Sequence, residues 1–175
     1  VGPVDWVLMT VKAYDLEGAA RGILPLIGPE TAVLPLLNGV DAAERIGSVV
    51  GTAHVLGGLA YVFSSIVEPG VIRQVSPFDR IEFGELAGGL SARGAAIEAA
   101  LRRAGIEARQ VPDIRAALWT KFLFLAAVSG VAALTRSPLG PLLSDPDARA
   151  LFIACMREVE ALARRQGIAL KEGIV

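Results

Sequence analysis

Cysteine, histidine and lysine are scarce in this sequence, and each scarcity limits the sites that the chain can build. The single cysteine, Cys155, excludes an internal disulfide and a cysteine-based zinc site. The only histidine, His54, has no Ser–Asp set and no second metal ligand near it in the sequence, so we interpret it as structural and expect no metal. Only Lys12, Lys121 and Lys171 are lysines among 17 basic residues. Lys12 and Lys121 interrupt apolar segments, where an ammonium group is unfavourable unless it has a charged or hydrogen-bonding partner or serves a function.

Strong net charge and long hydrophobic runs are also missing. The formal net charge is -1 and the pI about 5.9, so no overall field favours nucleic acid or an anionic membrane surface. The longest apolar run covers residues 122–134, 13 positions, whereas a membrane span needs about 20 residues. The first six residues include no initiator methionine and no basic targeting region, so we expect the sequence to begin within a longer protein. We therefore expect a cytoplasmic protein with a small-molecule ligand, without nucleic acid or membrane as partners.

The first part of the chain has the pattern of an α/β fold. Residues 6–11 and 31–37 are short, buried and rich in β-formers, and helical spacing over residues 15–26 lies between them. Two strands joined by a helix predict a parallel sheet. Strand-like segments follow at 54–62, 71–75 and 80–83, with turns expected at 68–70 and 76–77 and a loop at 64–65, and a helix at 92–104 and a strand at 107–111 complete this part.

Beyond residue 113 the pattern becomes helical, over residues 114–134 and 146–166. We place a domain boundary near residue 112, which separates an α/β domain (1–112) from the start of a helical domain (113–175). No two glycines stand two positions apart anywhere in the chain, so the dinucleotide-binding pattern G-x-G-x-x-G is absent, and so is a phosphate-binding P-loop.

Two polar positions follow predicted parallel strands, Lys12 after the first and Asn38-Gly39 after the second. Open α/β sheets bind ligands at the carboxyl ends of their strands, so the pair suggests a binding crevice. An ordinary turn at Asn38-Gly39 and a surface lysine at Lys12 are the competing interpretations.

Lys121 opens a helical stretch that is otherwise apolar for 13 residues. Such a lysine either extends its ammonium group outward to solvent or faces a cleft. Burial lowers a lysine pKa, and a lysine titrating closer to neutrality can donate a proton to a developing alkoxide. Leu125 and Ser129 follow at i+4 and i+8, on the same helical face, and would line whatever Lys121 faces.

Four segments together resemble the ketopantoate reductase (2-dehydropantoate 2-reductase) family. They read VLMTVKAY at 7–14, LLNGV at 36–40, EPGV at 68–71 and RAALWTK at 115–121, and the likeness continues to REVEALARRQGI at 157–168. The resemblance implies a Rossmann-type NADPH-binding domain over 1–112 and the first part of a helical substrate and dimerisation domain, similar to the C-terminal domain of 6-phosphogluconate dehydrogenase, over 113–175. It also implies a chain incomplete at both ends, lacking the glycine-rich phosphate loop and the last helices.

The resemblance further assigns roles to residues. It implies that Lys121 is the general acid in the NADPH-dependent reduction of a 2-oxo acid to a 2-hydroxy acid, the pantoate-forming step of pantothenate biosynthesis. Asn38 then lies beside the nicotinamide and the substrate, and Lys12 near the adenosine phosphate of the cofactor.

The sequence departs from the family's best-known members in the expected substrate wall. Their asparagines four, eight and eighteen positions after the catalytic lysine are replaced here by Leu125, Ser129 and Leu139. A less polar wall indicates a different, bulkier 2-oxo acid than ketopantoate, with Ser129 the remaining hydrogen-bonding position. Another two-domain NAD(P)-linked hydroxy acid dehydrogenase and a non-catalytic ligand-binding or assembly module are the alternatives, and exposed apolar helix faces allow a homodimer.

Overall fold

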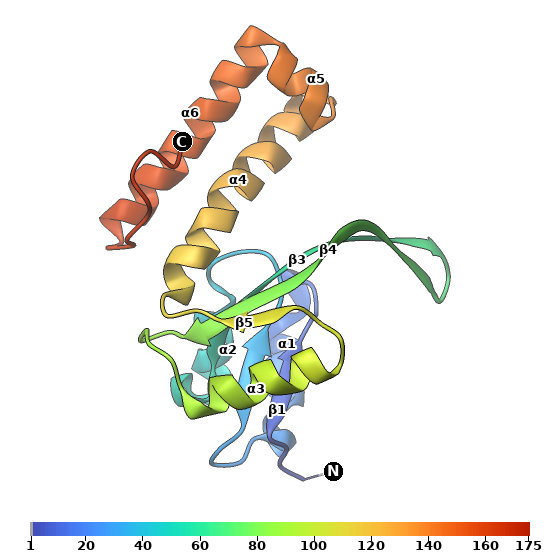
Figure 1. The fold of residues 1–175 in the computed structure, drawn as a ribbon, viewed down its shortest axis with the longest axis vertical. Coiled ribbons are helices and arrows are strands. Elements are labelled where there is room, and N and C mark those ends of the chain that lie inside the picture. Colours follow the sequence, from blue (N-terminus) through green and yellow to red (C-terminus); the bar gives the residue numbers. More distant parts are fainter. Residues whose placement is uncertain (1) are drawn as a thin grey trace. The chain divides into compact units, whose positions relative to one another are not determined.

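The structure is a computed structural model that describes residues 2–175 (Figure 1). It confirms the predicted α/β class, with parallel strands followed by a helical region. The chain divides into two compact units, one that extends to Ile114 and one that runs from Arg115 to Val175. The predicted boundary near residue 112 lies two positions before this division.

The first unit begins with the predicted βαβ arrangement. Strand β1 (Trp6–Met9) pairs in parallel with β2 (Ala32–Pro35), with Trp6 opposite Ala32 and Met9 opposite Pro35. The connection is a short α-helix, α1 (Leu16–Gly22), between two 3-10 turns, η1 (Ala13–Asp15) and η2 (Leu24–Leu26). The single helix predicted over 15–26 is thus divided, because Pro25 has no N–H to continue an α-helical hydrogen-bond series.

A long hairpin extends the sheet. Strands β3 (Leu56–Glu68) and β4 (Val71–Glu85) pair antiparallel, β5 (Ala108–Gln110) pairs in parallel with β4, and a single bridge between Val33 and Val55 joins β2 to the start of β3. The predicted loop at 64–65 and turn at 76–77 are therefore wrong, since both lie within these strands. A β-bulge accommodates the Ser76-Pro77 segment, and bulges are sites where a proline without an N–H is tolerated.

Helices cover both faces of the sheet. Strand residues alternate between the faces, so Val33 packs with Ile46 of α2 (Ala42–Val50) while Leu34 packs with Ile97 of α3 (Ala92–Arg103). Helix α3 begins as predicted at Ser91, whose Oγ accepts a hydrogen bond from the Gly94 N–H at 3.1 Å. The core of this unit is therefore a sheet between two helical layers, the arrangement typical of nucleotide-binding α/β domains.

The second unit is helical. Its helices are α4 (Ile114–Thr135), α5 (Leu139–Ser144) and α6 (Pro146–Arg165). Ala127 and Val131 of α4 pack with Leu142 of α5 and Phe152 of α6 in one buried cluster. Helix α5 was not predicted, because its six residues are too few to show a helical period.

Helix α4 is long and largely apolar. It has 22 residues, and an 18-residue window within it has a mean hydropathy of 1.8, so it is long and apolar enough to cross a membrane by length and composition. The uninterrupted apolar run of 13 residues after Lys121 lies within this longer helix. One such helix is weak evidence for a membrane span, since the core helix of a soluble protein passes the same test. Residues of α4 pack against α5 and α6, and 22% of the apolar 18-residue window of α4 is buried.

Candidate active site

The parallel register of β1 and β2 places Lys12 and Asn38 at equivalent positions. Met9 and Pro35 are the last paired residues, and Lys12 and Asn38 each follow three positions later. Both side chains are exposed, at the carboxyl edge of two neighbouring strands. The structure thus brings these two predicted residues onto adjacent loops, at the edge where α/β sheets bind ligands.

The loop that carries Asn38 turns at Gly39. Gly39 has a φ of 119°, in a region that side-chain-bearing residues rarely adopt, and a Cβ there would lie 3.3 Å from Oδ1 of Asp41. The chain then enters helix α2 at Ala42. Asn38-Gly39 is therefore part of a bend that directs the backbone away from the strand end, and Asn38 is exposed.

Arg45 joins the two loops, and sequence analysis did not single it out. Its Nη2 donates a hydrogen bond to the carbonyl oxygen of Ala13 at 2.6 Å, next to Lys12. Its Nη1 lies 3.4 Å from Oδ2 of Asp41, in the loop after Asn38. One guanidinium group thus contacts both the segment that follows Lys12 and the segment that follows Asn38.

Glu17 holds the guanidinium of Arg45 in place. Its two carboxylate oxygens accept hydrogen bonds from Nε and Nη2 of Arg45 at 2.8 and 3.0 Å. This two-point contact lowers the pKa of Glu17 and raises the pKa of Arg45, chiefly through the hydrogen bonds themselves. Because 28 positions separate the partners, no local sequence pattern could have revealed the contact.

Lys121 lies in helix α4 of the second unit and is half-buried. Burial lowers the pKa of its ammonium group, as predicted for a lysine within an apolar helix. Leu125, one turn later, is half-buried, and Ser129, two turns later, is exposed. The structure therefore supports one face carrying Lys121, Leu125 and Ser129, while the approach of Lys121 to Asn38 stays a prediction.

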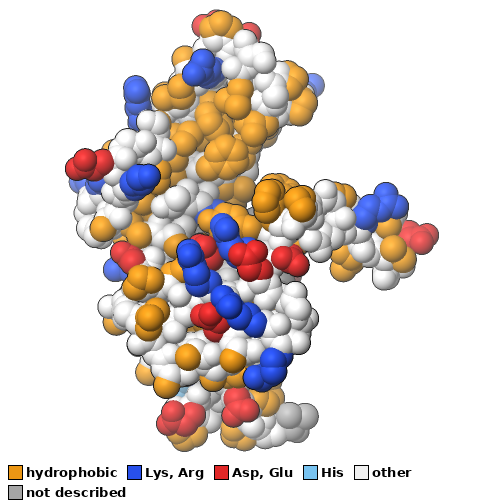
Figure 2. All heavy atoms as spheres, in the orientation of Figure 1, with side chains coloured by type: hydrophobic (Ala, Val, Ile, Leu, Met, Phe, Trp, Pro, Cys, Tyr) orange, Lys and Arg blue, Asp and Glu red, His pale blue; other side chains and the backbone are white. Residues whose placement is uncertain are grey.

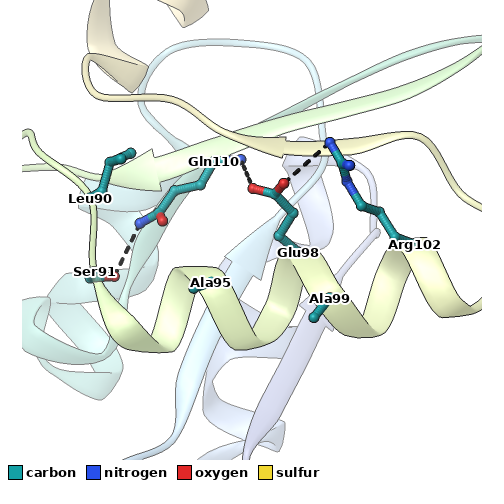
Figure 3. A pocket seen from close by; sticks show the side chains of 7 residues that line it. All are labelled: Leu90, Ser91, Ala95, Glu98, Ala99, Arg102 and Gln110. Carbon is teal, nitrogen blue, oxygen red and sulfur yellow. Dashed lines mark hydrogen bonds and ion pairs between the residues drawn. The ribbon is translucent and has the colours of Figure 1, made fainter.

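A groove in the first unit contains none of the predicted site residues (Figure 3). Its polar groups attach α3 to the edge of β5. Glu98 accepts a hydrogen bond from the Gln110 N–H at 2.8 Å, and Arg102 donates to the Ala108 carbonyl oxygen at 2.9 Å. Glu98 and Arg102 also form an ion pair at 3.2 Å. These contacts satisfy backbone groups at the strand edge, so we interpret the groove as structural.

His54 likewise has a structural role. Its Nδ1 lies 3.0 Å from the carbonyl oxygen of Thr31, the residue that precedes β2. Thr31 in turn donates a hydrogen bond from its Oγ1 to the Val4 carbonyl oxygen, just before β1. The histidine therefore helps to fix the amino ends of the two strands, opposite the edge that carries Lys12 and Asn38.

Comparison with known proteins places this arrangement in one family. Residues 1–88 match the family model described as Ketopantoate reductase PanE/ApbA, and residues 113–175 match the model of its C-terminal region. The family consists of pyridine-nucleotide-dependent oxidoreductases that act on small-molecule substrates.

Three similar proteins agree with the family models. The chain is 31% identical to the uncharacterized oxidoreductase YkpB of Bacillus subtilis, over 95% of the chain and 55% of that protein. It is 28% identical to a 2-dehydropantoate 2-reductase of Mesorhizobium japonicum, over 99% of the chain and 59% of the relative. The crystal structure of 2-dehydropantoate 2-reductase from Porphyromonas gingivalis matches 99% of the chain and 60% of its own length, with a TM-score of 0.90 and 28% identity.

The chain thus spans a little over half the length of the curated relatives that it matches. The two matched regions cover most of both structural units, and the matching crystal structure superposes on 99% of the chain. This chain belongs to the ketopantoate reductase family.

Proposed function

We propose that the complete protein reduces a 2-oxo acid to the corresponding 2-hydroxy acid with NADPH, in the cytoplasm. Residues 1–112 contribute part of the nucleotide-binding domain, and residues 113–175 contribute the start of the helical substrate domain. Family membership supports the reaction class, and the half-buried ammonium group of Lys121 is the observation that carries the assignment of the proton donor. The known 2-dehydropantoate 2-reductases among the relatives make ketopantoate the reference substrate.

The residues after β1 and β2 fit a pyridine nucleotide. Lys12 has an exposed ammonium group, which suits a phosphate, and Asn38 has an amide that can both donate and accept hydrogen bonds. Arg45 keeps the two loops at a fixed spacing. In this proposal Lys12 binds the adenosine phosphate, and Asn38 contacts both the nicotinamide and the substrate.

Lys121 supplies the proton in the proposed reaction. When bound, the reduced nicotinamide provides the hydride that adds to the keto carbon. The electron pair of the carbonyl bond moves onto its oxygen, and the ammonium group of Lys121 donates a proton to that oxygen. Because burial favours the neutral amine, proton loss from Lys121 is easier than from a solvated lysine. The amine then regains a proton from water.

Leu125 and Ser129 form the proposed substrate wall. Both lie on the face of α4 that carries Lys121, and Leu125 contributes an apolar surface. An apolar wall cannot hydrogen-bond the hydroxyl group of ketopantoate, so we expect better turnover with a bulkier apolar 2-oxo acid. Ser129 is the hydrogen-bonding group that remains on this wall.

The test is a panel of 2-oxo acids offered to the complete polypeptide with NADPH or NADH, with loss of nicotinamide absorbance as the readout. We expect NADPH to be preferred and an apolar branched substrate to exceed ketopantoate in kcat/KM. Leu125→Asn should shift this preference toward ketopantoate by roughly 10-fold or more, and Leu125→Met is the matched control. Turnover with none of the panel would refute the proposed reaction, and an unchanged ratio in Leu125→Asn would refute the role of Leu125.

A further inference from the structure

A buried carboxylate on the sheet of the first unit is shared by two arginines. Glu82 of β4 is buried, and its Oε1 accepts a hydrogen bond from Nη2 of Arg109 at 3.1 Å and lies 3.4 Å from Nε of Arg80. Basic and acidic side chains gather around the β5 edge of this sheet (Figure 2). Because both guanidinium groups are charged and only one carboxylate lies between them, the group of three has one positive charge in excess. The cluster by itself therefore favours an anion.

The guanidinium of Arg80 is held on a second side by Tyr61. The two residues pair across the β3–β4 hairpin, and Cζ of Arg80 lies 4.6 Å from the centroid of the Tyr61 ring, which is a cation–π contact. Burial and the nearby charge of Glu82 raise the pKa of the Tyr61 hydroxyl, so the ring stays neutral at ordinary pH. Tyr61 and Glu82 thus fix the orientation of the guanidinium before a ligand arrives, which lowers the entropic cost of binding.

The hydrogen-bonding capacity of Arg80 is only partly used by the protein. Its Nε is buried and makes no hydrogen bond within residues 2–175, and its side chain is 43% exposed. Arg93 of the same unit is different, because its three nitrogens all donate, two to the carboxylate of Glu85 and one to the carbonyl oxygen of Ala53. Arg93 therefore has the contacts of a structural arginine, whereas the accessible guanidinium of Arg80 has donors available for a ligand.

The Tyr61–Arg80 pair lies at the same edge of the sheet as Asn38. The parallel bridge between Val33 and Val55 aligns β2 with β3. Asn38 is five positions after Val33, and Tyr61 is six positions after Val55. Strands rise about 3.3 Å per residue, so Tyr61 lies close to the level of Asn38 along the strand direction. The pair is thus at the carboxyl end of the parallel strands, where α/β sheets bind ligands.

We propose that Arg80 binds the carboxylate of the 2-oxo acid, and that Tyr61 and Glu82 position its guanidinium. This inference rests on the proposed reaction, in which the substrate has a carboxylate next to its keto carbon. Lys121 serves the keto oxygen and the apolar wall serves the substrate side chain, so the carboxylate requires a cation of its own. A guanidinium group matches a carboxylate with two parallel N–H donors. A phosphate of the cofactor is the other anion that this group could bind, and the test separates the two.

The first test measures binding without turnover. The probe is 3-methyl-2-oxobutanoate, titrated calorimetrically into the complete polypeptide with NADP⁺ present, and NADPH is titrated separately. Arg80→Gln should weaken the probe by about 10–100-fold and leave NADPH affinity unchanged, because a hydrogen-bonded charge pair is lost. Glu82 keeps its contact with Arg109 in this variant, so the protein should remain folded. The control is Arg73→Gln, an exposed arginine of the same strand, which should change neither affinity.

Two outcomes of this titration would overturn the proposal. If Arg80→Gln weakened NADPH and left the probe unchanged, the arginine would serve a cofactor phosphate instead. If the unaltered protein and the variant bound the probe equally, or neither bound it, Arg80 would have no role in binding the acid. A protein that binds the probe through Arg80 but oxidises NADPH with no 2-oxo acid would refute the proposed reaction and retain the carboxylate site, so the two failures are distinguishable.

The second test asks whether Arg80 recognises the charge of the substrate. The unaltered enzyme should prefer the 2-oxo acid to its uncharged methyl ester in kcat/KM, and Arg80→Gln should reduce this preference at least 10-fold. Tyr61→Phe keeps an aromatic ring beside the guanidinium and should retain probe affinity, whereas Tyr61→Leu should weaken it by about 2–5-fold. An acid-to-ester ratio that is the same with and without Arg80 would contradict the assignment.

Discussion

Replacement of Gly58 by alanine should damage both the stability of the fold and the position of Asn38. Gly58 is buried in β3, and a Cβ there would lie 2.4 Å from Cδ1 of Leu34 and 2.5 Å from the carbonyl oxygen of Pro35. The leucine methyl can turn away, but the carbonyl belongs to the backbone of β2. Carbon–oxygen contacts of this kind normally measure about 3.3–3.6 Å, so β2 must move by roughly 1 Å.

This displacement determines the expected magnitudes. Forcing one extra methyl group into a packed core costs about 1–3 kcal/mol, which is a large share of the stability of a typical domain. Pro35 lies three positions before Asn38, so the loop moves with the strand. A misplacement of about 1 Å at a reacting group can reduce turnover on the order of 100-fold.

Two measurements check the Gly58→Ala prediction. Urea unfolding of the purified protein should show a lower midpoint with an unchanged slope. NADPH oxidation by the complete polypeptide should slow on the order of 100-fold. Gly18→Ala is the control, because no atom lies within 4 Å of a Cβ at that position in α1, and it should stabilise the helix by about 0.5–1 kcal/mol. If the Gly58→Ala protein had the stability and turnover of the unaltered protein, β2 could accommodate the added methyl group without loss of either, and the prediction would be wrong.

Three further predictions concern charged groups. Lys121→Met should lower turnover by about 10²–10⁴-fold with little change in NADPH affinity. Burial lowers the pKa of Lys121 below 10.5, so its buried charge reduces the free energy of unfolding at pH values below the lowered pKa. This destabilisation is relieved as the pH rises through the lowered pKa. The methionine variant should therefore unfold at a higher temperature at neutral pH, and the rate of the unaltered enzyme should decline as the pH rises through the lowered pKa; a flat alkaline profile would contradict this. Arg45→Ala should raise the KM for NADPH by roughly 10-fold and Arg45→Lys by less, with nearly unchanged thermal unfolding, and an equal loss in both variants would deny a specific bridging role. Hydrogen bonds from Arg93 lower the pKa of Glu85 below 4.5, so this pair stabilises the fold above that value and its contribution is lost as the pH falls through the lowered pKa. Glu85→Gln should accordingly show a flatter loss of stability in acid, measured by urea unfolding at several pH values.

Much of the fold could be predicted because its signals are local. The buried runs at the start of the chain, with a helix between them, specify a parallel pair, and Ser91 marks the first turn of α3. The hairpin was predicted in pieces because Ser64, Ser65 and Pro77 resemble turn residues. Their strand conformation depends on pairing across the hairpin and on the bulge around Ser76, which a local pattern does not contain.

The candidate site was also predicted only in part. Lys12, Asn38 and Lys121 were predicted because a polar residue is conspicuous at the end of a buried strand or within an apolar helix. Arg45 was missed, because an arginine in an amphipathic helix has an ordinary explanation and its partner Glu17 lies 28 positions away. The residue that spans the two loops is identified only by its contacts.

The sequence by itself determined the α/β class and the helical second part, and it singled out the polar residues that we propose as the site, because hydrophobic period and residue type act over a few neighbouring positions. Only the tertiary structure decided that Lys12 and Asn38 follow two paired strands at equivalent positions, that Arg45 joins their loops, and that the hairpin continues beyond the sheet with exposed apolar side chains. Those features depend on contacts between segments far apart in the chain, whose energies exist only once folding has brought the segments together.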